Sequence, residues 1–282
     1  MLVIIGLVIV FVSIIGGYSL VDGPVAMLLQ PAELIIIFGA AIGAFVMSGT
    51  GYVLKLALKN FGKIFGGKSP GKDDYLEILA VLHALFSKMH REGVISIEKD
   101  IEHPDQSPMF QRFPRIAKDK EACFFIGDTL RIYLTTGSAG ELEKLMAVDM
   151  EAMHEEEMLP IHTVARMAES LPGMGIVAAV LGVVLTMGKI NAPPDELGHA
   201  IGAALVGTFI GILLCYGVFA PMAYKMETMA IERELFFRAI REAVGAAVRG
   251  SSPMVALEYG RRAIPLTFRP TFHEMEQKLK GG

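Results

Sequence analysis

Four stretches of the chain are apolar over the length of a membrane-spanning helix, and none contains Asp, Glu, Lys or Arg: Leu2–Leu20, Leu34–Leu54, Leu171–Gly188 and Ala200–Tyr224. A helix needs about 20 apolar residues to cross the hydrocarbon core of a bilayer. No basic residue precedes the first stretch, which is also too long for the core of a cleaved signal peptide. The pattern therefore predicts four transmembrane helices. We expect them to be uninterrupted, because the bilayer offers no water to an unpaired backbone.

Between the spans the apolar residues follow a helical period. Asp74–His90 carries an apolar stripe at the i, i+3, i+4 and i+7 spacing, and Glu121–Tyr133 and Glu141–Glu169 have a similar pattern. We predict an all-α integral membrane protein with four parts. These are a membrane pair of helices (1–54), a large helical loop (55–170), a second membrane pair (171–224) and a helical tail (225–282).

The basic residues predict the direction of the spans. Lysines are frequent directly after the second span, from Lys55 to Lys72, and basic residues recur after the fourth, from Lys225 to Arg241. The link Val21–Glu33 has no Lys or Arg, and the link Lys189–His199 has only its first residue. By the positive-inside rule, the loop, the tail and both chain termini are cytoplasmic.

Composition excludes several classes of protein. The chain is 52% hydrophobic and 20% charged, and its mean hydropathy is +0.48. A soluble domain is less apolar, so a soluble enzyme, a disordered chain and a secreted disulfide scaffold are excluded. Cys123 and Cys215 lack metal-ligand spacing, and a net charge of −4 gives no argument for nucleic acid. We expect no metal, no cofactor and no enzymatic activity.

One nucleotide motif is rejected. Gly62–Ser69 fits the phosphate-loop pattern, but that loop needs a strand before it and a helix after it. Here a membrane helix precedes the motif and Pro70-Gly71 follows, which predicts a juxtamembrane linker. His154 among Glu151 and Glu155–Glu157 could suggest a metal site, but a solvated helix face is commoner.

Small residues recur inside the spans at the spacing that lets helices approach closely. The glycines concerned are Gly39, Gly43, Gly175, Gly182, Gly207 and Gly211. They are consistent either with packing inside one four-helix bundle or with packing against other chains.

The spans contain no acidic or basic side chain, although ion-coupled machines usually place one within the membrane. Either the chain moves no ion, or a partner supplies the titrating group. Thr208 is the most useful polar side chain in the spans, although its hydroxyl could simply bond back to a carbonyl of its own helix. Pro172 could begin a helix, whereas Pro221 should loosen the end of one, because it lacks a backbone donor.

Several collinear strings resemble the MotA family of flagellar motor stator subunits, within the MotA/TolQ/ExbB proton channel superfamily. They are Gln30-Pro-Ala-Glu-Leu34, Ser96-Ile-Glu-Lys-Asp-Ile-Glu102, Ser170-Leu-Pro-Gly-Met-Gly-Ile-Val-Ala-Ala179, Val206-Gly-Thr-Phe-Ile-Gly211, Tyr216-Gly217 with Pro221, and Phe268-Arg-Pro-Thr-Phe272. The resemblance implies a multi-pass protein of the bacterial inner membrane, in which five copies surround two copies of MotB. It also implies that Pro172, Thr208 and Pro221 lie near the MotB aspartate that binds the ion.

The resemblance further implies that ion flux rotates the ring, which pushes the rotor protein FliG in flagellar rotation and chemotaxis. For the rotor contact, Glu98 matches the family's acidic position, while the basic position holds His90 with Arg91 beside it. Sodium-driven relatives resemble one another in a threonine where this chain has Ala179, so we predict a proton-driven motor. Ser96 is expected to cap the helix that carries Glu98.

Three other functions fit parts of the pattern. An ExbB- or TolQ-like energy-transducing subunit would also form a ring around a pair of partner chains. Proteins of that kind resemble three-span chains, whereas four spans are predicted here. A stand-alone channel or transporter would conduct ions without a partner. A membrane NTPase would need Lys68 for nucleotide binding.

Overall fold

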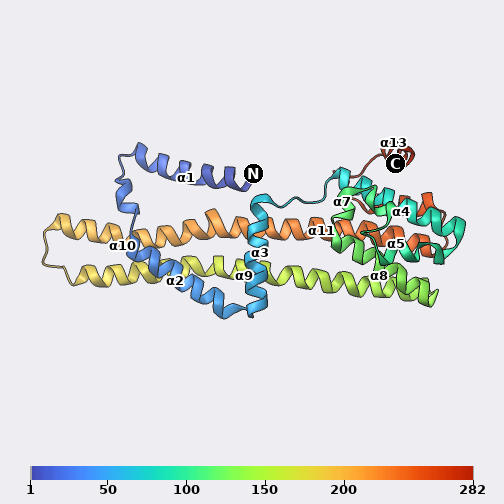
Figure 1. Cartoon of the computed structure of the whole chain (residues 1–282). Coiled ribbons are helices and arrows are strands. Elements are labelled where there is room, and N and C mark those ends of the chain that lie inside the picture. The colour runs from blue at the N-terminus through green and yellow to red at the C-terminus, as the bar shows by residue number, and fades with distance from the viewer. Residues whose placement is uncertain (1, 282) are drawn as a thin grey trace. The chain divides into compact units, whose positions relative to one another are not determined.

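The computed structural model describes residues 2–281, which form helices and no strand. The first half contains α1 (Leu2–Leu20), η1 (Val25–Leu28), α2 (Pro31–Ser48), α3 (Gly51–Gly66), α4 (Lys72–Glu92), η2 (Val94–Ile97), α5 (Glu98–Glu102), α6 (Pro108–Gln111), α7 (Pro114–Ala117) and α8 (Lys120–Thr136). The second half contains α9 (Ala139–Met187), α10 (Pro194–Leu214), η3 (Cys215–Phe219), α11 (Ala220–Val248), α12 (Pro253–Ala263) and α13 (Phe272–Gly281), as Figure 1 shows.

The chain forms two compact units. Residues 2–67 and 156–228 make one, called the membrane unit here, and residues 68–155 and 229–281 make the other, called the polar unit. Four helical segments are long and apolar enough to cross a membrane: Leu2–Leu20, Val25–Ser48, Ala139–Met187 and Pro194–Val248. The predicted class, an all-α protein with four membrane-spanning helices, is confirmed.

The second predicted span is wrong at both ends. Helix α2 already begins at Pro31, so Glu33 lies in its first turn rather than in the link before it. The helix ends at Ser48, because extended Gly49 and Thr50 follow and the Thr50 hydroxyl accepts a hydrogen bond from the Val53 amide at 3.5 Å to start α3. The expectation of an uninterrupted helix to Leu54, free of charged residues, therefore fails.

The third span is the last part of a much longer helix. The predicted helix Glu141–Glu169 and the span after it form one 49-residue helix, α9, which continues through Pro160 and Pro172. Pro172 therefore does not begin a helix.

The helix that follows α10 changes its hydrogen bonding just before Pro221. Cys215–Phe219 forms a π-helical turn. Proline has no amide hydrogen to donate to the carbonyl four residues earlier, and one wider turn accommodates that missing bond. The expected loosening at Pro221 takes this local form, and the chain continues into α11.

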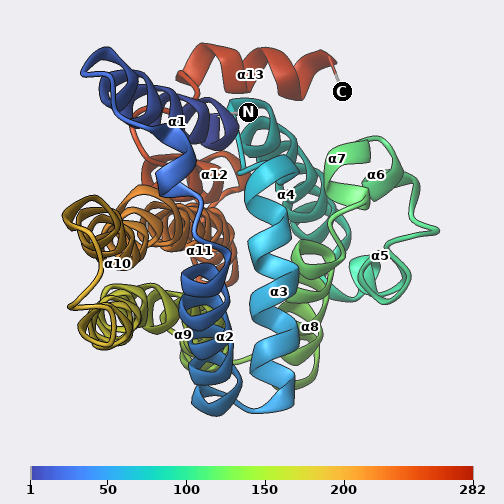
Figure 2. The ribbon, with the colours of Figure 1, turned by 90° about the vertical axis from the view of Figure 1, so that its left-hand side faces the viewer.

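In the membrane unit, α9 and α10 lie side by side, as both views show (Figures 1 and 2). Helix α2 packs against α10. The buried apolar cluster draws on these three helices and on η3: Ile37, Ala41, Ala168, Leu171, Ala178, Val206, Ile210 and Cys215. By contrast, α1 contains no buried residue.

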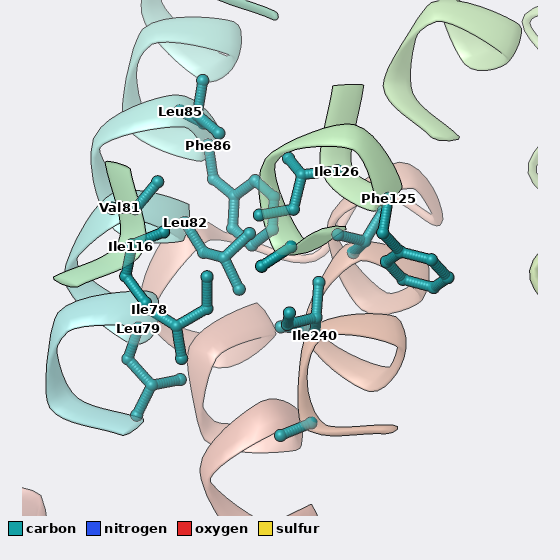
Figure 3. Packing of buried hydrophobic residues seen from close by; sticks show 14 of the residues in the cluster. Ile78, Leu79, Val81, Leu82, Leu85, Phe86, Ile116, Phe125, Ile126 and Ile240 are labelled. Atoms are coloured by element: carbon teal, nitrogen blue, oxygen red, sulfur yellow. The ribbon is translucent and has the colours of Figure 1, made fainter. Parts of the chain in front are cut away.

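The polar unit has the larger core. Helix α4 buries the predicted stripe, including Ile78, Leu82 and Phe86, and Figure 3 shows these side chains directed toward Ile126 of α8 and Ile240 of α11. The predictions for Asp74–His90 and Glu121–Tyr133 are thus confirmed as α4 and α8. Burial of the Tyr75 phenol in this core raises its pKa to about 12, with the nearby Glu232 charge adding to the effect.

Candidate ion pathway in the membrane unit

Helices α9 and α10 approach so closely that their backbones touch. A Cβ added at Gly175 would lie 2.7 Å from the Gly207 carbonyl oxygen, and one at Gly211 would lie 2.6 Å from the Leu171 carbonyl oxygen. Since real Cβ atoms do not come within 3.0 Å of such atoms, only glycine fits at these positions. Gly182 faces Ala204 in the same way, with a Cβ separation of 2.7 Å.

The other two glycines singled out in the sequence lie elsewhere. A Cβ added at Gly39 or Gly43 on α2 would meet nothing within 4 Å. Within this chain, α2 therefore approaches no other backbone at these two positions.

Ala179 and Thr208 each lie next to a glycine of the α9–α10 contact. The Ala179 amide nitrogen is 3.2 Å from the position of a Cβ on Gly207, and the Thr208 Cα is 3.3 Å from that of a Cβ on Gly175. Ala179 is buried and Thr208 is half-buried. Pro172, which precedes Ala179 by about two helical turns on α9, is half-buried, and Pro221, which follows the π-helical turn, is exposed. The structure thus places Ala179 and Thr208 at the same α9–α10 contact, whereas Pro172 precedes Ala179 on α9 and Pro221 follows the π-helical turn.

The Thr208 hydroxyl differs from the other threonines of the membrane unit's long helices. The hydroxyls of Thr163, Thr186 and Thr228 each donate to the carbonyl four residues earlier at 2.9 Å. In the described part of the chain, the Thr208 hydroxyl donates to no carbonyl of its own helix. The back-bonded alternative is therefore not observed. This hydroxyl is available to another group.

Sequence reasoning missed Glu33. Its side chain is only 8% exposed, and it faces the glycines of α9 and α10. It was missed because the first charged residue was used as the boundary of the span. Two signals were present, since Pro31 at the first helical position and an acid in the first turn both mark a helix start before Glu33.

The three rotor-contact candidates gather at one end of the polar unit. His90 and Arg91 are exposed in the last turn of α4, and Glu98 is exposed where η2 passes into α5. A partly buried ion pair holds these elements together, because Lys88 Nζ is 2.8 Å from Asp100 Oδ2 while Ser107 Oγ donates to Asp100 Oδ1 at 2.6 Å.

Ser96 does not cap the helix of Glu98. Its hydroxyl donates to the Gly93 carbonyl at 2.6 Å, and α5 begins after Ile97 without a side-chain cap. The turn at Gly93, which has φ +85°, uses the hydroxyl instead.

The two rejected motifs have ordinary structural surroundings. Most of the phosphate-loop pattern belongs to α3, which ends at Gly66. The His154 Nδ1 atom lies 2.9 Å from Glu234 Oε2. Among the described residues no three His, Cys, Asp or Glu side chains are placed to hold a metal ion.

Comparison with known proteins then identifies the chain. Residues 4–93 match the family described as Motility protein A N-terminal, and residues 124–238 match the MotA/TolQ/ExbB proton channel family. The chain is 36% identical over 281 residues to motility protein A of Escherichia coli (strain K12), covering 99% of this chain and 95% of that protein. The chain belongs to the motility protein A family. It is therefore a stator subunit of the bacterial flagellar motor.

Other relatives agree with this assignment. The chain is 34% identical over 275 residues to chemotaxis protein LafT of Vibrio parahaemolyticus, covering 97% of this chain and 96% of that one. Its fold is similar to that of C. jejuni MotAB, with a TM-score of 0.79 at 20% identity over 94% and 95% of the two chains. The flagellar MotAB stator complex of Bacillus subtilis gives 0.75 at 23% identity over 99% and 98%. The N-terminal family match favours motility protein A over an ExbB- or TolQ-like subunit, because it covers the first helix pair.

Proposed function

We propose that five copies of this chain form a ring around two copies of a MotB-like partner in the inner membrane. The observation that carries this proposal is the exposure of the membrane unit's apolar helices. No residue of α1 is buried, and the outer faces of α9 and α10 expose large apolar side chains such as Leu185 and Leu205. Such surface suits lipid and neighbouring chains. The ring of five and the pair of MotB chains follow the family resemblance.

In this arrangement the partner carries the carboxylate that binds the transported ion. Thr208 lies at the α9–α10 contact beside Gly175, and its hydroxyl, which donates to no carbonyl of its own helix, is the polar group that this chain offers to that carboxylate. Pro172 and Pro221 flank the same pathway. Gly39 and Gly43 have no close neighbour within the chain, so they are positions where α2 would meet another chain.

The loop 55–170 and the tail 225–282 face the cytoplasm, as do both termini. Exposed His90, Arg91 and Glu98 contact the rotor protein FliG there. Ion flux turns the ring, and these charges transmit the torque.

The transported ion is the proton. A sodium ion stripped of water needs several oxygen ligands, whereas Ala179 contributes no side-chain oxygen to the crossing. Swimming speed measured against sodium concentration at fixed pH tests this directly. We expect no dependence on sodium, and a strict requirement for sodium contradicts the proposal.

The assembly is tested by expressing the chain with a MotB-like partner in a motile strain that lacks its own stators. We expect restored swimming, and imaging of the purified complex should show a ring with two foreign helices at its centre. The matched control is the chain without the partner, which should form no conducting complex. Dissipation of a pH gradient by the purified chain alone would instead identify a stand-alone channel.

A further inference from the structure

A buried carboxyl group lies inside the membrane unit without a partner. The Glu33 side chain is 8% exposed, and its Oε2 atom makes no hydrogen bond in the structure. This oxygen is 2.9 Å from the position that a Cβ on Gly207 would occupy, and Oε1 is 3.8 Å from the position of a Cβ on Gly182. The absence of side chains at these two glycines makes the space that the carboxyl group occupies.

The carboxyl group lies deep along the helices that surround it, although Glu33 is in the first turn of α2. With a rise of about 1.5 Å per residue, Gly207 is roughly 20 Å along α10 from Pro194, and Gly182 is roughly 8 Å from the last residue of α9. Both glycines belong to the apolar part of candidate membrane spans. The Glu33 carboxyl group therefore lies against the apolar parts of two candidate spans.

Among the described residues, no cationic side chain pairs with this group from the elements packed around it. From Leu171 to Met187, α9 has no titratable residue, and Glu169 precedes that stretch. On α10 the titratable residues Asp195, Glu196 and His199 are exposed near its start. Helix η1 contributes none, and Lys189, in the link between α9 and α10, is exposed.

An ionised carboxylate in such a place costs several kcal/mol or more, because burial removes its hydration and no positive charge replaces it. Native structures rarely keep a buried charge without a partner. The neutral, protonated carboxyl group is therefore the form that fits this buried site.

We propose that Glu33 is a proton-binding site of the membrane unit, which takes up and releases a proton during transport. The inference rests on the proposed function, since it adds a carboxyl group of this chain to the one that the partner supplies. The ligand is a proton rather than a metal cation. The niche is lined by glycine backbone, and the buried Thr186 hydroxyl on the same helix as Gly182 already donates to the Gly182 carbonyl at 2.9 Å.

The position of Glu33 links its protonation to the candidate pathway. Gly207 lies between Glu33 and Ala179, since a Cβ on Gly207 would be 2.9 Å from Glu33 Oε2 and 3.2 Å from the Ala179 amide nitrogen. Ionisation of Glu33 demands water or a cation, and the buried Oε2 atom has no hydrogen-bond donor in the described part of the chain. Release of the proton thus favours separation of α2 from α10, directly beside Ala179 and Thr208.

The first experiment labels the complete stator complex with an apolar carbodiimide, which reacts with protonated carboxyl groups, and locates the adduct by mass spectrometry. We expect labelling of Glu33 that declines as the pH is raised, whereas exposed Glu196 on α10 serves as the matched control and reacts with a water-soluble carbodiimide instead. A Glu33 carboxyl that resists the apolar reagent at every pH contradicts the proposal.

The second experiment measures proton conduction and swimming speed across a range of pH for Glu33→Gln, Glu33→Asp and the control Glu196→Gln. Gln mimics the protonated form and keeps the shape, so the complex should still purify intact while conduction falls about tenfold or more, as expected for loss of a positioned proton-transfer group. Glu33→Asp should restore part of the activity with a changed pH profile.

The outcomes separate the two proposals. If Glu33→Gln conducts like the unmodified complex with the same pH profile, the carboxyl group has only a structural role and this inference is wrong. If the unmodified chain neither assembles with a MotB-like partner nor conducts with it, the proposed function itself fails.

Discussion

Arg233 of α11 forms a bidentate ion pair with Asp119, the residue that caps α8. Its Nη1 atom lies 2.5 Å from Oδ2 and its Nη2 atom 2.6 Å from Oδ1, while the Asp119 Oδ1 atom also accepts from the Ala122 amide at 3.1 Å. The guanidinium carbon lies 4.6 Å from the centre of the Phe237 ring. One side chain therefore joins the start of α8 to the aromatic core of the polar unit.

Replacing this arginine by lysine removes the two-pronged contact but keeps the charge. We expect Arg233→Lys to destabilise the chain by about 1–3 kcal/mol, since the pair is mostly shielded from solvent and lysine cannot match the fork. Denaturant unfolding in detergent measures the loss. The control is Arg131→Lys, whose exposed pair with Asp128 should cost less than about 0.5 kcal/mol. Equal effects of the two changes would refute the structural role of Arg233.

A methyl group at the α9–α10 crossing should disrupt it. In Gly211→Ala the new Cβ would lie 2.6 Å from the Leu171 carbonyl oxygen, so backbone must move at a cost of about 1–3 kcal/mol. Thermal stability of the purified complex should fall accordingly. Gly39→Ala is the comparison, because its Cβ meets nothing within the chain. Loss of the ring in Gly39→Ala, with the monomer intact, would place that glycine at a contact between chains.

Thr208 and Thr186 allow a comparison between a hydroxyl without a hydrogen bond and a hydroxyl that donates to a carbonyl of its own helix. Thr208→Val keeps the shape and removes the unbonded hydroxyl, so we expect swimming speed and proton conduction to fall severalfold. Thr186→Val removes a bond to the Gly182 carbonyl and should change conduction little. The same assay decides the matter, and a Thr208→Val motor with full speed would exclude a role for this hydroxyl.

Charge reversal should reveal the rotor contact. Arg91→Glu and Glu98→Lys are expected to abolish swimming while the complex assembles normally, because both side chains are exposed and their loss leaves the Lys88–Asp100 pair in place. The control on the same short helix is Glu102→Lys, which is also exposed. Swimming on soft agar gives the readout. Normal motility of both variants would mean that torque passes through other residues.

Acid should weaken the tail through Glu258. Hydrogen bonds from Arg261 and Arg262 lower the pKa of this carboxyl from 4.5 to about 2. Because the folded pKa is the lower one, the pair stabilises the fold fully above about pH 4.5 and less as the pH falls toward 2. The contribution is below about 1 kcal/mol, since Arg262 is exposed. The free energy of unfolding should depend less steeply on pH between about 2 and 4.5 in Glu258→Gln than in the unmodified chain. An unchanged dependence on pH would contradict the role of Glu258.

Hydrophobic pattern was enough to predict the number of spans, although not the ends of the second, and the helices α4 and α8 of the polar unit. The stripe on Asp74–His90 predicted which face of α4 is buried, because period and burial follow the same rule. The pattern could not show which helices meet, and so it could not show that glycines of α9 and α10 leave room for the Glu33 carboxyl group. The Gly49-Thr50-Gly51 break was readable in principle, since threonine is a good first residue for a helix.

The absence of any fully buried residue in α1 has a consequence for the cell. A helix that buries no residue fully in its own chain gains most of its contacts when neighbours arrive, so an orphan subunit remains incomplete in the bilayer. Membrane proteases favour such loosely held segments. The abundance of this protein should therefore track the supply of its partner, which lets assembly itself act as quality control over the number of subunits that survive.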